Sequence, residues 1–132
     1  MATQVMGGPL VQVRDLVKTF AGRGTVLRKS KSQVQAVAGV SFDVLEGETL
    51  SIVGESGCGK TTAGRTLLKL TEPTSGKIFF EGRDITDLKP SAMRSLRAQM
   101  QIIFQDPYSA LNPRQTIGKI ISAPFEIQGI EP

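Results

Sequence analysis

Alternating apolar and polar positions predict short strands along the chain. The stretch from Leu10 to Phe20 predicts an edge strand, and Val37 to Leu45 predicts a second strand. Between them, Ala21 to Gln35 is polar, basic and contains glycine, which is typical of a loop or a frayed hairpin tip. Further short strands are predicted at 48–53, 77–81 and 101–104, with turns at 46–48 and 82–84.

Three segments instead carry apolar residues at helical spacing. Lys60 to Leu70 predicts a helix whose apolar positions are Ala63, Leu67, Leu68 and Leu70, and residues 72–76, which include Pro73 and Gly76, should end it. Pro90 to Ala98 predicts a short helix with proline near its start. Thr116 to Ala123 predicts the beginning of another helix, ended by Pro124. Strands alternating with helices indicate an α/β protein.

A complete phosphate-binding motif, G-x-x-x-x-G-K-[ST], lies between the predicted strand at 48–53 and the helix that begins at Lys60. Strand, loop and helix is the context that this motif requires, which disfavours a chance glycine-rich turn. Glycines allow a tight turn whose N–H groups point at phosphate oxygens, Lys60 adds charge for the β- and γ-phosphates, and the Thr61 hydroxyl can ligate Mg²⁺. The motif comprises Gly54, Glu55, Ser56, Gly57, Cys58, Gly59, Lys60 and Thr61.

Composition narrows the class of protein further. The 132 residues carry a net charge of +4, and four basic residues without an acidic neighbour (Arg23, Arg28, Lys29, Lys31) account for it. A solvated basic loop explains that run better than a nucleic-acid or lipid contact. No apolar run approaches the roughly 20 residues of a membrane span, and no signal peptide is visible. The single cysteine cannot form a disulfide within the chain, and together these features suit a cytoplasmic protein. Because there is no histidine, histidine bases and histidine metal ligands are excluded within these residues.

Several segments together resemble the ATP-binding subunits of ABC transporters, and in particular the oligopeptide, dipeptide and nickel import branch. The phosphate loop alone is shared with kinases and GTPases. The more specific stretch is Phe104-Gln105-Asp106-Pro107 followed by Leu111-Asn112-Pro113-Arg114, which is similar to the Q-loop of that branch. Supporting stretches are residues 38–44, 47–50 and 53–62.

The resemblance implies an α/β P-loop NTPase fold, namely an incomplete ABC nucleotide-binding domain with an N-terminal antiparallel β subdomain. It implies that ATP and Mg²⁺ bind at residues 54–62, Thr62 included. It also implies that Lys60 and Gln105 are catalytic and that Thr61 and Gln105 are Mg²⁺ ligands. Phe20 would stack on adenine, although a core strand residue is an equal alternative. We expect a β-rich part over 10–53, the loop and helix over 54–70, strands to the Q-loop over 71–115, and the start of a helical subdomain over 116–132.

Several family motifs do not occur in these residues. There is no Leu-Ser-Gly-Gly-Gln signature, no switch histidine and no convincing Walker B strand. The run from Ile102 to Phe104 is a poor Walker B candidate because Gln105 takes the acidic position and Pro107 the place of the catalytic glutamate. We therefore expect an N-terminal fragment that hydrolyses ATP poorly alone.

The resemblance implies permease subunits and a second ATP-binding subunit as partners, no nucleic acid, and a place on the cytoplasmic side of the plasma membrane. The leading function is the ATPase subunit of an importer, with peptides as its cargo. Alternatives are a small P-loop kinase, a non-transport ABC ATPase, and a nucleotide-binding fragment without turnover.

Overall fold

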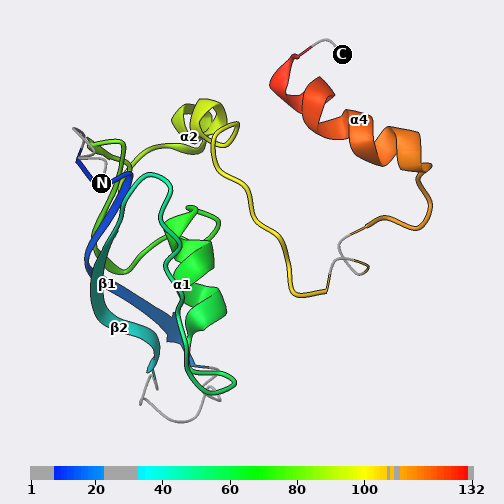
Figure 1. Ribbon diagram of the computed structural model, residues 1–132. Helices are drawn as coiled ribbons and strands as arrows, with labels where there is room; N and C mark the ends of the chain where they lie inside the picture. Colours follow the sequence, from blue (N-terminus) through cyan, green and yellow to red (C-terminus); the bar gives the residue numbers. More distant parts are fainter. Residues whose placement is uncertain (1–7, 23–32, 107, 109–110, 131–132) are drawn as a thin grey trace. The chain divides into compact units, whose positions relative to one another are not determined.

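A computed structural model describes residues 8–22, 33–106, 108 and 111–130 of the chain (Figure 1). The basic run at 23–31 and Pro107 lie outside these residues. The chain divides into two compact units, Met1–Asp87 and Leu88–Pro132, and each is described by itself.

The first unit is built on a four-stranded antiparallel sheet. Strands β1 (Val11–Ala21), β2 (Gln33–Val44), β3 (Ser75–Phe80) and β4 (Arg83–Asp84) lie in the order β2-β1-β3-β4. This sheet confirms the predicted antiparallel part. Strand β2 begins earlier than expected, because Gln33, Val34 and Gln35 pair with β1 instead of forming a loop. The predicted turn at 82–84 contributes the two-residue strand β4.

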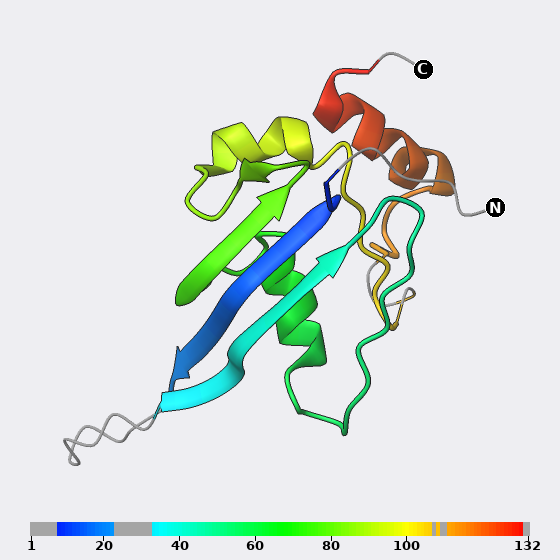
Figure 2. The same cartoon turned by 60° about the vertical axis from the view of Figure 1, so that its left-hand side comes forward.

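Helix α1 (Lys60–Leu67) covers one face of this sheet, against β1 and β2 (Figure 2). Val13, Leu16 and Ile78 are fully buried. Val13 and Leu16 are three residues apart, and an irregularity in the pairing of β1 between them lets both side chains be buried. Ala63 and Thr66 are the buried residues of α1. The core of the first unit therefore supports the helix that follows the phosphate loop.

The predicted helix to Leu70 is too long, since α1 ends at Leu67. Leu70 donates its main-chain N–H to the carbonyl of Arg65, and Lys69 has a φ of 54°, so the chain turns sharply after the helix. Gly76, expected in the helix stop, instead lies in β3, where a Cβ would be 2.4 Å from the carbonyl oxygen of Asp15. Only glycine permits β3 to approach β1 so closely at this point.

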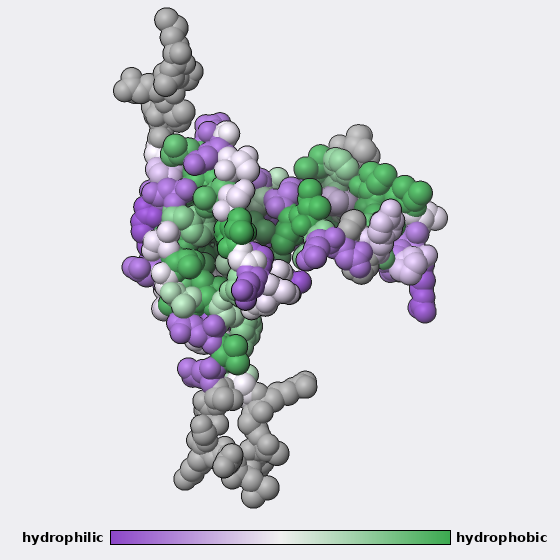
Figure 3. Space-filling view, turned by 60° about the horizontal axis from the view of Figure 1, so that its bottom comes forward, coloured by the Kyte–Doolittle hydropathy of each residue, from purple (hydrophilic) through white to green (hydrophobic). Residues whose placement is uncertain are grey.

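The strand predicted at 48–53, before the phosphate loop, is wrong. Among the described residues no segment pairs with it, and a strand requires a hydrogen-bonded neighbour. Its apolar side chains stay accessible, with Leu50 at 42%, Ile52 at 50% and Val53 at 92% exposure. Apolar side chains are visible at the surface in Figure 3.

The second unit contains helices α2 (Pro90–Leu96) and α4 (Ile117–Gln128). The strand predicted at 101–104 is wrong for the same reason, as no described segment pairs with it, and Ile103 is 92% exposed. The expectation that Pro124 ends the last helix is also wrong. Proline removes one main-chain hydrogen bond, whereas the Thr116 side chain caps the first turn and Gly129, at a φ of 70°, closes the last one.

Candidate functional site

The phosphate loop ends at the N-terminus of α1. Gly57 and Gly59 have φ values of 81° and 102°, a region that glycine adopts without strain. Gly59 is the N-cap of α1, no side chain caps the helix there, and its first turn carries no acidic residue. The unpaired N–H groups and the positive end of the helix dipole therefore favour an anion at this point.

Lys60 is held by the loop itself. Its ammonium donates to the carbonyl oxygens of Gly54 and Glu55, at 2.6 Å each, and lies 3.7 Å from the sulfur of Cys58. These bonds keep a positive charge inside the curve of the loop. The same ammonium can exchange carbonyl oxygens for phosphate oxygens, which are stronger acceptors.

Thr61 and Thr62 occupy the first turn of α1 directly after Lys60. Thr61 is exposed, so its hydroxyl is accessible to a metal ion that also binds phosphate oxygens and water. The main-chain carbonyl of Thr62 accepts a hydrogen bond of 2.8 Å from the Thr66 hydroxyl. No cluster of histidine, cysteine, aspartate or glutamate side chains suited to a metal occurs in the part of the chain that the structure describes.

Gly59 also lies against the beginning of β2. A Cβ placed on Gly59 would be 1.9 Å from the carbonyl oxygen of Ala36. The sequence motif contains no sign of this contact, because Ala36 lies outside it. The contact fixes the end of the phosphate loop relative to the β1–β2 hairpin.

Phe20 lies on that hairpin, close to the phosphate loop. It pairs with Val34, two residues before Ala36. One strand spacing across the sheet and two residue rises along the strand, which are perpendicular to each other, place Phe20 about 8 Å from Ala36. The length of the intervening loop does not affect this distance. Phe20 is 43% exposed, whereas the alternative of a core strand residue would bury it.

A largely apolar groove of about 410 Å³ runs beside the phosphate loop. It exists because the segment at 48–53 lies near β2 without pairing to it. Outside the phosphate loop, Gln35 of β2 is the one polar residue among the described residues that line the groove. Its lining comprises Gln35, Ala36, Val37, Ala38, Val40, Phe42, Ile52, Val53, Cys58, Gly59, Lys60 and Ala63.

Gln105 belongs to the second unit and lies in residues 101–106, which form neither helix nor strand. It is exposed, as the neighbouring Ile103 and Phe104 are. The structure brings Phe20, Lys60 and Thr61 into one unit, and Gln105 lies in the other. Its catalytic and metal-binding role stays a prediction.

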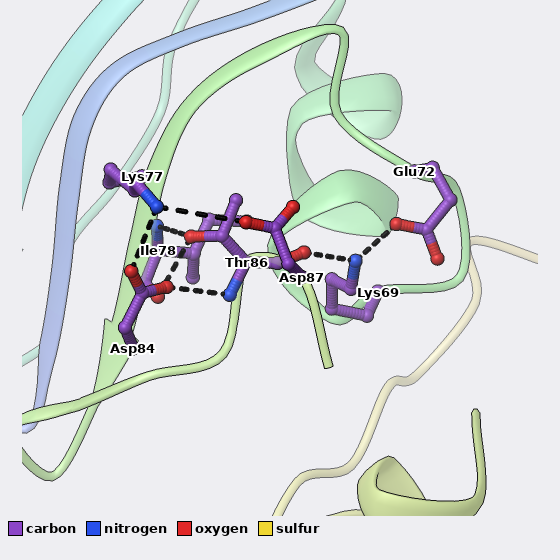
Figure 4. Close-up of polar contacts among 7 residues, drawn as sticks. All are labelled: Lys69, Glu72, Lys77, Ile78, Asp84, Thr86 and Asp87. Atoms are coloured by element: carbon purple, nitrogen blue, oxygen red, sulfur yellow. Dashed lines mark hydrogen bonds and ion pairs between the residues drawn. The ribbon is translucent and has the colours of Figure 1, made fainter. Parts of the chain in front are cut away.

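The sequence analysis did not predict a polar network formed by residues that follow α1 in the chain, between Lys69 and Asp87 (Figure 4). The Lys69 side chain is 1% exposed, and its ammonium donates to the carbonyl of Thr86 and pairs with the Glu72 carboxylate. Thr86, through its side chain and main-chain N–H, together with Lys77, holds the pKa of Asp84 down at about 2. The only sequence signal was a lysine among apolar residues at the end of a helix.

A glycine loop with positive-φ residues, a lysine inside its curve and a threonine in the following helical turn define a P-loop nucleotide-binding protein. Comparison with known proteins narrows the class. Residues 37–128 match the ABC transporter family. The chain belongs to the ABC transporter family, and its fold is that of the ABC nucleotide-binding domain.

Curated relatives include the glutathione import ATP-binding protein GsiA of Escherichia coli (strain K12) and of Shigella dysenteriae serotype 1. Each is 49% identical over 130 residues, which cover 98% of this chain and 21% of the relative. The chain thus spans about a fifth of the length of the curated relatives it matches.

Among solved structures, a dimeric post-hydrolysis ATP-binding cassette bound to ADP and Pi is similar, with a TM-score of 0.72 and 25% identity. The match covers 89% of this chain and 47% of that one. The family assignment favours the transporter over the small P-loop kinase.

Proposed function

We propose that this chain is the ATP-binding part of an ATPase subunit that drives an importer, with short peptides as the class of cargo. The observation that carries the proposal is the Lys60 ammonium, held at 2.6 Å from two carbonyl oxygens of a glycine loop at the uncapped start of α1. The relatives named for glutathione import support the choice of cargo, because glutathione is a tripeptide.

The residues of the loop have separate roles in this proposal. Main-chain N–H groups from Gly54 to Thr62 surround the phosphates, and Lys60 neutralises the β- and γ-phosphates. The hydroxyl of Thr61 holds Mg²⁺, which when bound offsets phosphate charge. Phe20 stacks on the adenine. Gln105 orients the attacking water and contributes to the Mg²⁺ site, as its resemblance to the Q-loop implies.

Partners follow from the same family. A second ATP-binding subunit faces this one, in keeping with the similar cassette that is dimeric in its solved structure. Permease subunits carry the cargo, and the chain acts on the cytoplasmic side of the plasma membrane. No helix in the described residues is long and apolar enough to cross a bilayer.

A second candidate function is nucleotide binding without turnover. The 132 residues contain neither the signature motif nor a histidine. Positioned donors around the γ-phosphate supply most of the catalysis in phosphoryl transfer, so these residues alone should bind MgATP and hydrolyse it slowly.

The proposal can be tested through Cys58, the only cysteine of the chain, which is exposed within the loop. MgATP should slow alkylation of Cys58 by a small maleimide in a concentration-dependent manner. Lys60→Ala should abolish the protection, because it removes the phosphate partner. Each variant is compared with itself with and without MgATP, since Lys60 also contacts the thiol.

Lys77→Ala is the matched control, as it removes a lysine from β3 in the same unit. It should leave the protection as in the wild type. Equal alkylation rates with and without MgATP in the wild type would overturn the proposal. Turnover that depends on Lys60 and proceeds at rates typical of transport ATPases would instead exclude the second candidate.

A further inference from the structure

We propose that Lys18 is a positioning residue for the nucleotide base, because its ammonium covers one face of the Phe20 ring and so orients that ring. The inference rests on the proposed function, in which Phe20 stacks on adenine. Lys18 belongs to none of the motifs in the sequence.

Lys18 lies two residues before Phe20 on β1, and its ammonium is 5.0 Å from the centroid of the Phe20 ring. A cation at this distance is attracted to the negative face of an aromatic ring. The same ammonium donates a hydrogen bond of 2.7 Å to the carbonyl oxygen of Glu72. Lys18 is therefore fixed at its charged end and covers one face of the ring.

The anchor of Lys18 is itself held in place. Glu72 offers its carbonyl to Lys18, and its carboxylate pairs with the buried ammonium of Lys69. Lys69 also donates to the carbonyl of Thr86. Glu72 is thus tied through Lys69 to the segment that follows the β3–β4 hairpin (Figure 4), which holds the carbonyl that accepts from Lys18 in place.

With one ring face occupied by the ammonium, a base can stack only on the other. Phe20 is 43% exposed, which leaves surface available for stacking. A ring that is already oriented loses less conformational freedom when the base binds. The contact between Ala36 and Gly59 places this ring beside the phosphate loop, so one nucleotide can reach both.

The test compares two ligands, MgATP and magnesium tripolyphosphate, which has the phosphates but no base. Their dissociation constants are measured by protection of Cys58 from alkylation in the whole chain. Lys18→Gln can keep a donor for the Glu72 carbonyl but lacks the charge. Lys18→Gln should raise the dissociation constant of MgATP about two- to fivefold and leave that of tripolyphosphate unchanged. Lys18→Arg should restore MgATP binding, since guanidinium also pairs with rings.

A double-mutant cycle separates positioning from general stability. Phe20→Ala should raise the dissociation constant of MgATP roughly tenfold. In the Phe20→Ala background, Lys18→Gln should not raise it further. Equal weakening of both ligands by Lys18→Gln would overturn the proposal and assign Lys18 to the phosphates. Unchanged affinity for both ligands would overturn it as well. Lys18→Met, checked for a native melting temperature, provides a second uncharged variant. Failure of the wild type to bind either ligand would refute the nucleotide site itself.

Discussion

The main-chain carbonyl of Ala36 occupies the place where any side chain on Gly59 would begin. A Cβ at Gly59 would lie 1.9 Å from that oxygen, far inside van der Waals contact. The last glycine of the phosphate loop is therefore required twice, once for its φ of 102° and once for this packing. The phosphate loop can approach the β1–β2 hairpin this closely only because residue 59 is a glycine.

Gly59→Ala should destabilise the first unit by about 3 kcal/mol or more, because the left-handed backbone and the clash with Ala36 add together. Denaturant unfolding without nucleotide measures this change. Gly57→Ala is the matched control, since Gly57 has a φ of 81° but nothing within 4 Å of a Cβ. It should cost about 1–3 kcal/mol. Equal losses in the two variants would show that the Ala36 contact contributes nothing.

Lys69→Met should lower the free energy of unfolding by about 1–3 kcal/mol, because the carbonyl of Thr86 loses its buried donor. Glu72→Gln should cost less than about 1 kcal/mol, since that carboxylate is 67% exposed. Urea unfolding of both variants compares the two bonds of Lys69. A larger loss in Glu72→Gln would contradict the structure.

Asp84 should make the sheet sensitive to acid. Thr86 and Lys77 favour the charged carboxylate, so its pKa falls from 3.8 to about 2. This stabilisation is complete above the ordinary value and disappears as the pH falls through about 2. Between pH 5 and 2, wild-type stability should therefore fall more steeply than that of Asp84→Asn. Asp87→Asn, which removes a carboxylate 88% exposed and 3.7 Å from Lys77, should retain the wild-type slope.

Gly64→Ala should stabilise the protein by about 0.5–1 kcal/mol, because alanine favours the interior of a helix. A Cβ at Gly64 would meet nothing within 4 Å. Thermal unfolding should show a higher midpoint. Gly39→Ala should have the opposite sign, since Gly39 has equal space but a φ of 74°. Destabilisation by Gly64→Ala would indicate that α1 is not helical there.

Local patterns predicted the features that depend on local chemistry. Alternation placed β1 and most of β2 and β3, and the motif placed the phosphate loop before α1. Prediction failed where distant partners decide the outcome. The segments at 48–53 and 101–104 have apolar alternation typical of strands, yet no described segment supplies their hydrogen bonds.

Two features of the site depend on backbone atoms, which the sequence does not display. The carbonyl of Ala36 against Gly59 and the carbonyl of Glu72 beneath Lys18 follow from how β1, β2 and the turn after α1 meet. The prediction that Pro124 ends the helix failed for a related reason. Proline costs the helix one main-chain hydrogen bond at its own position, but the caps at both ends of α4 outweigh that loss.

Pairing of Phe20 with Val34 makes the position of Phe20 relative to Ala36 and the phosphate loop independent of the length of the connection between β1 and β2. The connection can therefore become longer or shorter in evolution without a change in the position of Phe20. A protein engineer can use the same freedom: a tag or a reporter domain inserted between β1 and β2 should leave the position of Phe20 relative to the phosphate loop unchanged.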